Sequence, residues 1–289
     1  MRLGATLPQT EIGPDPADLL KFASAVEAAG LQFLDTYEHV LGADRSTRPD
    51  WDGLYDLDSQ FHEPFVLFGF LAARTTLELS TSVLVLPQRQ TALVAKQAAE
   101  VDVLSGGRLR LGVGLGWNAV EYGALGKNFT DRAARYEEQI ELLRLLWTQR
   151  SVTFHGRYEH VDAAGLLPMP VQQPIPIWMG GGTSRPVLER IGRIGDGWMC
   201  TAAPGYGLEE AVEIIHAAAI DAGRDPSEIG LQGGVMVRAA VDRDRIRRHL
   251  DKWERAGASH AVISAIGSGR SPQQHIDVIH EAASAALDR

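Results

Sequence analysis

Cysteine is nearly absent from this chain of 289 residues, which contains only Cys200. A single thiol excludes an internal disulfide framework and a cysteine-rich metal centre, and it fits a reducing compartment. No apolar run is long enough to span a membrane, and the first residues lack the basic and apolar regions of a secretory leader. These absences predict a cytoplasmic protein with no membrane partner.

Positive charge is also scarce. The 28 Lys and Arg residues are outnumbered by 37 Asp and Glu residues, so the formal net charge is −9, and no long basic run occurs. A nucleic acid would have to bind a local patch against this repulsive background. We therefore predict no nucleic-acid partner and expect the partner to be a small-molecule substrate.

Common catalytic and metal-binding motifs are missing as well. Apart from His39, the eight histidines form neither H-E-x-x-H nor H-x-H, so the sequence predicts no metal site. A G-x-S-x-G nucleophile elbow does not occur, which argues against an acyl-transfer hydrolase. Cys200 has no identifiable base nearby and is interpreted as a buried small residue.

Short β-like runs alternate with longer helical segments along the whole chain. The eight strand candidates are apolar or β-branched and lie at 3–7, 31–37, 77–86, 108–114, 176–181, 196–201, 232–241 and 260–266. The intervening helix candidates include 64–75, 91–104, 131–148, 184–193 and 208–222. Eight βα units are what a (β/α)8 TIM barrel requires. We predict this barrel as a single domain over residues 1–289, with a doubly wound open sheet as the competing fold.

Two longer segments interrupt this alternation. Residues 40–63 follow the second strand candidate, and residues 149–174 contain SVTFHGRYEHV, which is typical of a small hairpin turning at His155 and Gly156. Insertions of this kind in a barrel often cover the mouth and contact substrate. We expect both segments at the C-terminal face, where they would form a lid.

Glycines gather at two of the predicted strand ends, where TIM barrels place their active sites. The first cluster, in GVGLGWNA (112–119), has neither the spacing of a dinucleotide fingerprint nor the Gly-Lys-Ser/Thr of a phosphate loop. Such small residues let a flat ligand approach the backbone, although relief of crowding inside the barrel explains them equally well. The second cluster, Gly180–Gly182, precedes a helix and offers N–H groups to a phosphate, with an ordinary loop as the alternative.

His39 directly follows the second strand candidate, between Glu38 and Val40. An imidazole at this place can donate or accept a proton near neutral pH, or hydrogen-bond a reacting oxygen. A lone histidine is more often structural, however. This segment alone therefore does not assign a catalytic role.

Several longer stretches occur together and in a fixed order: LDTYEHVLGAD, LSGGRLRLGVGLGW, the R-x-x-R-x-x-E run at 132–138, PIWMGGG and IGDGW. In these the chain resembles the bacterial luciferase-like monooxygenase superfamily. Within it, the chain is similar to oxidoreductases that use coenzyme F-420, an 8-hydroxy-5-deazaflavin. The resemblance is weakest after residue 205. It implies a luciferase-like TIM barrel, and homodimers are common among similar proteins.

The resemblance also implies roles for particular residues. In similar proteins the histidine matching His39 lies beside the reactive face of the (deaza)flavin ring and does acid/base or oxyanion-stabilising work. The bond matching Ser82–Val83 is a non-proline cis peptide behind the central ring. Arg89 and Trp198 would border the cleft. The expected cofactor contacts along the ring, the ribityl chain and the phosphate are Gly114, Gly116, Trp117, Asn118, Gly180, Gly181 and Gly182.

Two enzymatic activities are compatible with this resemblance. The first is hydride transfer between coenzyme F-420 and a small organic substrate, and the alternative is an FMN-dependent monooxygenase that inserts one oxygen atom from O2. A barrel that binds the cofactor without turnover is a third possibility, which the retained His39 argues against. A sugar-phosphate dehydrogenase branch has an acidic residue directly after the glycine matching Gly116. Here Trp117 stands there and Glu121 comes later, which argues against a sugar-phosphate substrate.

Overall fold

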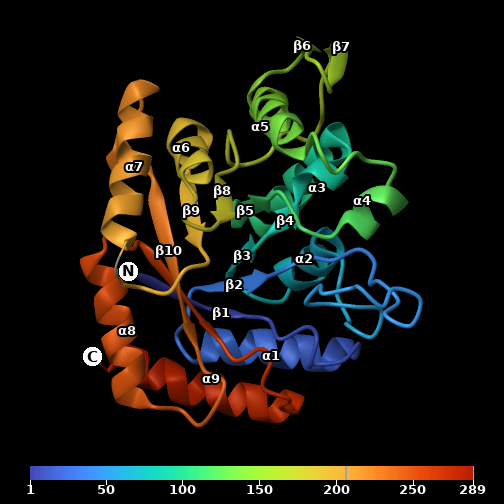
Figure 1. The fold of residues 1–289 in the computed structure, drawn as a ribbon. Helices are drawn as coiled ribbons and strands as arrows, with labels where there is room; N and C mark the ends of the chain where they lie inside the picture. The colour runs from blue at the N-terminus through green and yellow to red at the C-terminus, as the bar shows by residue number, and fades with distance from the viewer. Residues whose placement is uncertain (206, 289) are drawn as a thin grey trace.

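A parallel pairing between the two ends of the chain closes a barrel: strand β1 (Arg2–Thr6) lies beside strand β11 (His260–Ser264). The computed structural model describes residues 1–205 and 207–288. Neighbouring strands follow the order β3, β2, β1, β11, β10, β9, β8 and β5, and β5 pairs back with β3 (Figure 1). The prediction of a (β/α)8 barrel is confirmed, and the open sheet is excluded.

The strands and helices alternate as the sequence predicts. In chain order, the remaining barrel strands are β2 (Phe33–Thr36), β3 (Glu78–Thr81) with its continuation β4 (Leu84–Val85), β5 (Leu109–Gly114), β8 (Ile177–Gly181), β9 (Gly197–Cys200) and β10 (Gly230–Met236). The helices are α1 (Pro16–Ala28), α2 (Pro64–Ala72), α3 (Thr91–Ser105), α4 (Ala119–Ala124), α5 (Arg132–Thr148), α6 (Arg185–Ile194), α7 (Leu208–Asp221), α8 (Arg243–Arg255) and α9 (Pro272–Leu287). Single 3-10 turns lie at Leu86–Gln88 and Pro226–Glu228.

Helix ends follow local capping chemistry. Asp15 caps α1 by accepting a hydrogen bond from the N–H of Ala17 (2.9 Å), and Pro16 stands in the first turn. Ser271 and Gln274 form a capping box at the start of α9. Helix α4 was not predicted, because six residues are too few to show a helical period.

The third predicted strand, residues 77–86, is divided in the structure. Strand β3 pairs with β2 and β5, whereas β4 pairs with β5 only. The Ser82–Val83 peptide bond between the two pieces is cis, as the resemblance implies. The interruption lies at the carboxyl end of β3, where it shapes the mouth of the barrel.

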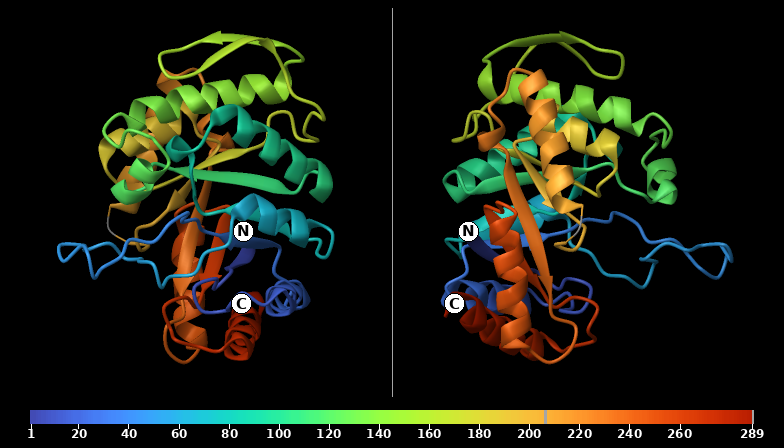
Figure 2. Two further views of the ribbon diagram at one scale, coloured as in Figure 1. Left: turned by 90° about the vertical axis from the view of Figure 1, so that its right-hand side faces the viewer. Right: turned by 60° about the vertical axis from the view of Figure 1, so that its left-hand side comes forward.

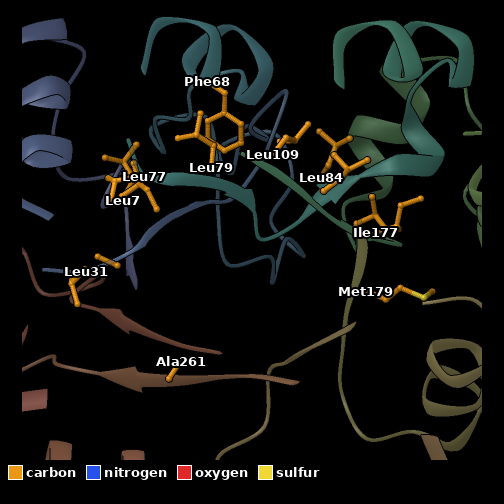
Figure 3. Packing of buried hydrophobic residues seen from close by; sticks show 14 of the residues in the cluster. Leu7, Leu31, Phe68, Leu77, Leu79, Leu84, Leu109, Ile177, Met179 and Ala261 are labelled. Atoms are coloured by element: carbon orange, nitrogen blue, oxygen red, sulfur yellow. The ribbon is translucent and has the colours of Figure 1, made fainter. Parts of the chain in front are cut away.

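The apolar core lies between the outside of the barrel and the surrounding helices. Figure 3 shows Phe68 of α2 next to Leu79 of β3, with Leu109 of β5 close by, and all three are buried. Gly192 of α6 lets α7 come close, since a Cβ there would lie 2.3 Å from the carbonyl oxygen of Ile215. This packing fixes the strands whose ends carry the site.

The amino-terminal end of the barrel interior contains buried charges. The Arg110 guanidinium lies over the rings of Phe33 (4.9 Å) and Trp178 (4.6 Å). Its Nε donates to Glu78 (2.6 Å) and its Nη1 to Gln232 (2.6 Å). Such stacking and charge-assisted hydrogen bonds replace the apolar side chains that usually fill a TIM barrel. The polar cluster therefore closes the end opposite the mouth.

His260 belongs to the same end of the barrel and should make stability depend on pH. Burial, with the neighbouring Arg110 charge, lowers the pKa of His260 to about 4. Because this pKa lies below the usual 6.5, the folded state gains stability above pH 6.5 and loses it as the pH falls toward 4. The expected loss across that window is about 3 kcal/mol.

Urea unfolding at pH 7, 5.5 and 4.5 measures this contribution. The variant His260→Gln should lose less stability than the wild-type protein over that range, because the glutamine does not titrate. His216→Gln, at an exposed position on α7, is the matched control and should behave as wild type. Equal losses in wild type and His260→Gln would contradict the assignment.

The two insertions occupy different places. Residues 40–63 follow the carboxyl end of β2 and form a long loop before α2, which extends well beyond the helices (Figure 2). Residues 149–174 contain the hairpin of β6 (Val152–His155) and β7 (His160–Ala164), which was predicted and which runs along the outside of α5. Glu138 of α5 accepts hydrogen bonds from the N–H groups of Arg157, Tyr158 and Glu159. The hairpin is therefore fastened to a helix and not to the mouth.

Among the residues that the structure describes, no helix has the length and apolar character needed to cross a membrane. The cytoplasmic location and the homodimer remain predictions.

Candidate active site

A cleft of about 790 Å³ opens at the carboxyl ends of the barrel strands. Its walls come from both halves of the chain, including Thr6 of β1, Met199 of β9 and Ser264 of β11. Ligand sites typically enclose 300–1,000 Å³, and TIM barrels place their active sites at this end. The cleft is therefore the candidate active site, and the predicted residues can be located relative to it.

Val83 forms part of the cleft wall and is seated between two of the predicted glycines. A Cβ on Gly114 would lie 2.5 Å from Cγ2 of Val83, and one on Gly180 would lie 2.4 Å from its Cγ1. Any larger residue at either position would collide with this valine. The two glycines thus admit the Val83 side chain, and Val83 presents an apolar surface to the cleft.

The other glycines of the first cluster also relieve crowding. A Cβ on Gly112 would meet the carbonyl oxygen of Thr81 at 1.9 Å. Gly116 has a φ of +67°, and a Cβ there would lie 2.4 Å from the Val85 side chain. The crowding explanation left open by the sequence is therefore correct for Gly112, whereas Gly114 and Gly116 also line the cleft.

The second glycine cluster combines a packed end and an open end. A Cβ on Gly181 would meet Val187 at 2.6 Å, whereas at Gly182 the nearest atom would be Oγ1 of Thr201 at 3.9 Å. Gly180, Gly181 and Gly182 all line the cleft, and α6 begins three residues after Gly182. The backbone at Gly182 is consequently accessible to a ligand near the start of a helix.

His39 lines the cleft and is held by a carboxylate that the sequence reasoning did not assign to it. The Nδ1–H of His39 donates to Oε2 of Glu121 (3.0 Å), a residue of α4 that is fully buried. The other oxygen, Oε1, accepts the N–H groups of Val40 (2.6 Å) and Leu41 (3.1 Å). Gln88 adds a hydrogen bond to Oε2 (3.3 Å).

These contacts keep Glu121 ionised. Burial alone would raise the pKa of its carboxyl, but the hydrogen bond and charge of His39, together with the N–H groups of Leu41 and Val40, outweigh burial and lower it. An ionised Glu121 accepts a hydrogen bond from the N–H at Nδ1 of His39, which leaves Nε2 as the imidazole nitrogen free to serve a ligand. The pair therefore resembles a base with its orienting carboxylate.

Aromatic rings surround His39, and one of them belongs to Trp117. The ring centroids of Tyr55, Phe61 and Trp117 lie 5.1, 4.9 and 5.2 Å from that of His39, and Trp51 lies 5.7 Å from Trp117. Trp117 lines the cleft with 42% of its surface exposed. Tyr55 brings the 40–63 insertion to the mouth, as expected, whereas no residue of 149–174 lines the cleft.

Three residues expected at the cleft are not among the residues that line it. Asn118 is buried and caps α4, accepting the N–H groups of Val120 (3.0 Å) and Glu121 (3.4 Å), so it supports the site from behind. Arg89 pairs with Glu38 and Glu63. Trp198 is buried and donates from Nε1 to the carbonyl of Gly181 (2.9 Å). Backbone and apolar groups therefore form the main cleft surface, and the cofactor contact of Asn118 stays a prediction.

The cleft carries little charge. Among its described lining residues, Glu38 and His39 are the only charged or readily protonated side chains, and neither Lys nor Arg is present. Glu38 is already engaged by Arg89 and by the N–H of Val85 (2.7 Å). Burial raises the pKa of the Cys200 thiol to about 11, so this lining residue remains a neutral thiol at pH 7. The cleft thus suits a ligand whose reacting part is uncharged.

Fold and cleft together define a TIM barrel whose mouth has a cleft of the size that small molecules occupy. Residues 1–288 match the luciferase-like monooxygenase family. The chain belongs to this family.

Individual relatives differ in the coenzyme that they use. The FMNH2-dependent dimethylsulfone monooxygenase of Pseudomonas putida is 30% identical over 228 residues, which are 78% of this chain and 59% of that protein. The F-420-dependent glucose-6-phosphate dehydrogenase of Gordonia bronchialis is 33% identical over 222 residues, which are 73% of this chain and 61% of that one. The chain therefore matches less than two thirds of the length of each of these two relatives.

A solved structure agrees over the whole barrel. The monooxygenase from Streptomyces bottropensis superposes with a TM-score of 0.81 at 18% identity, covering 100% of this chain and 99% of that one. At this identity the agreement concerns the fold. By the family match, the protein is an enzyme of a family that includes FMNH2-dependent and F-420-dependent members.

Proposed function

We propose that this protein is an F-420-dependent oxidoreductase that transfers a hydride between the coenzyme and a small, uncharged organic substrate. The observation that carries the proposal is the His39–Glu121 pair at the edge of a cleft with an apolar wall at Val83. The choice of coenzyme rests on the stretches shared with the F-420-dependent branch. The glucose-6-phosphate dehydrogenase relative supports it.

The residues of the cleft fit a flat ring that carries a phosphate. Val83, seated on Gly114 and Gly180, offers an apolar platform against which a ring can stack. Gly182 leaves backbone exposed near the first turn of α6, where N–H groups favour an anion. The phosphate would be bound without a cationic side chain, because none of the described lining residues supplies one.

When bound, coenzyme F-420 gives or accepts a hydride at C5 of its ring. Reduction of a carbonyl, or oxidation of an alcohol, also moves a proton at the substrate oxygen. We assign that proton to Nε2 of His39, while Glu121 holds Nδ1 and stabilises the positive charge of the imidazolium. Trp117 and Tyr55 position the substrate over the cleft and exclude water.

The substrate class follows from the lining. Tyr37, Tyr55, Trp117, Met236 and Ile266 contribute apolar surface, and no described lining residue offers a cation for a substrate phosphate or carboxylate. A sugar phosphate would therefore lose hydration without gaining an ion pair. We propose an alcohol, ketone or enone of moderate size as the substrate.

An FMN-dependent monooxygenase is the second candidate. The dimethylsulfone monooxygenase relative favours it, and the same apolar platform would accept an FMN ring. In that case His39 would supply a proton from Nε2 during insertion of the oxygen atom into the substrate.

Parallel titrations of the apo-protein with F-420 and with FMN separate the two candidates. Tryptophan fluorescence reports binding because Trp117 lines the cleft. We expect micromolar affinity for F-420, reduction or oxidation of F-420 with alcohols or ketones, and no O2 consumption. Binding of FMN alone, with O2 consumption in the presence of its reduced form, would overturn the proposal.

Two variants at one position locate the phosphate. Gly182→Asp places a carboxylate near the start of α6 and should weaken binding of the phosphorylated coenzyme at least tenfold, which is about 1.4 kcal/mol. Gly182→Ala is the matched control, since a Cβ there meets nothing closer than 3.9 Å. Equal coenzyme affinity in both variants would contradict a phosphate position at Gly182.

A further inference from the structure

The β6–β7 hairpin brings three possible metal ligands together on the outside of the barrel. His155 and His160 stand opposite each other in the antiparallel register, and Asp162 follows two residues later on the same strand. The two Nδ1 atoms are 3.0 Å apart. The Asp162 carboxylate lies 3.5 Å from Nε2 of His155 and 3.6 Å from Nε2 of His160. The sequence predicted no metal site, because these ligands meet only across a turn.

We propose that His155, His160 and Asp162 bind a divalent transition-metal ion such as Zn²⁺. Ligand atoms at about 2.0–2.1 Å from a tetrahedral Zn²⁺ lie about 3.3 Å from one another. The Nε2–carboxylate distances, 3.5 Å to Oδ1 and 3.6 Å to Oδ2 of Asp162, are close to that value. With one ligand atom taken from each residue, the three atoms lie within 4.8 Å of one another, so small side-chain movements complete the site. Two imidazoles and one carboxylate suit Zn²⁺, Ni²⁺ or Cu²⁺, whereas Mg²⁺ and Ca²⁺ prefer oxygen ligands.

The backbone holds these ligands before any ion arrives. Antiparallel register keeps the side chains of directly opposed residues close together on one face. The turn between the strands is fixed, because Glu138 accepts three N–H groups from residues 157–159 and Arg135 forms an ion pair with Glu159 (2.9 Å). An ion therefore loses little of its binding free energy to ordering the hairpin.

This metal site is separate from the candidate active site. None of the three ligands lines the cleft, and all three are exposed, so solvent can supply the remaining coordination position. An ion bound across β6 and β7 would join the two strands and stabilise the hairpin by mass action. Its effect should appear in the local stability of residues 152–164 and not in the chemistry at His39.

Calorimetric titration of tag-free, chelator-treated protein with ZnCl2 tests the proposal. We expect saturable binding at micromolar concentration in the wild-type protein and at least tenfold weaker binding in His160→Ala and in Asp162→Asn. All three ligand side chains are exposed, so these variants should fold as the wild type does. His216→Ala and His39→Ala are the matched controls and should bind as wild type.

Hydrogen exchange locates the ion. ZnCl2 should slow exchange of the amides in residues 152–164 in the wild-type protein and leave them unchanged in His160→Ala, whereas MgCl2 should affect neither. Binding that is equal in wild type and His160→Ala would overturn the proposal. So would Zn²⁺ binding without protection of the hairpin, since the ion would then lie elsewhere.

Discussion

Replacing His39 with alanine is expected to lower turnover by about 10²- to 10⁴-fold, the usual contribution of a positioned acid or base. Coenzyme affinity should change by less than about tenfold, or about 1.4 kcal/mol, because the apolar platform and the backbone at Gly182 remain. Measuring kcat and the coenzyme dissociation constant side by side checks both statements. Unchanged turnover in His39→Ala would show that His39 takes no part in the reaction.

Glu121 should act through His39, which makes it a positioning residue. Glu121→Gln keeps a side chain of the same shape but removes the charge that stabilises the imidazolium. We expect lower kcat, little change in KM, and a displaced limb in the pH–rate profile. His62→Ala is the matched control, since this histidine lies near the mouth yet does not line the cleft. A profile of unchanged shape in Glu121→Gln would limit Glu121 to a structural role.

Local sequence patterns were sufficient to predict the barrel. Apolar periodicity identified all eight strand positions, and Asp15 with Pro16 marked the start of α1. The sequence pattern did not predict that residues 77–86 divide into two strands at Ser82–Val83, because β-branched and apolar residues continue across this bond. Only the resemblance implied the cis bond there.

The sequence predicted where the candidate site lies in the barrel, but not what its individual residues contact. Gly114 and Gly180 were expected to lie against a ligand, yet both are needed first to admit Val83. Val83, Gly114 and Gly180 come from the segments of three different barrel strands, so their contact cannot be recognised from spacing along the chain. Glu121 illustrates the same limit, because its hydrogen bond to His39 spans 82 positions. The placement of 149–174 on α5 likewise depends on Glu138, a contact between distant segments.

Replacing Arg110 with methionine is expected to destabilise the protein by about 3–5 kcal/mol, the usual cost of removing one partner of a buried ion pair. Arg110 is 4% exposed and donates to Glu78 (2.6 Å), while Asp35 lies 3.9 Å from its Nη2. Methionine preserves much of the unbranched apolar stem between Phe33 and Trp178. Most of the loss should therefore come from Glu78, whose remaining cationic partner is the more exposed Arg2, and from the hydrogen bond to Gln232 (2.6 Å).

The pH dependence of the Arg110→Met deficit separates charge from packing. Burial alone would raise the pKa of Glu78, but Arg110, with smaller contributions from Arg2 and His260, lowers it. The Arg110–Glu78 pair therefore stabilises the fold above pH 4.5 and stops doing so as the pH falls below that value. The deficit in urea unfolding should be largest near pH 7 and should shrink on acidification. Arg2→Met is the matched control: Arg2 pairs with the same Glu78, but its side chain is 45% exposed, so about 1 kcal/mol or less is expected. A deficit that is independent of pH would assign the loss to packing and contradict a role for the buried charge.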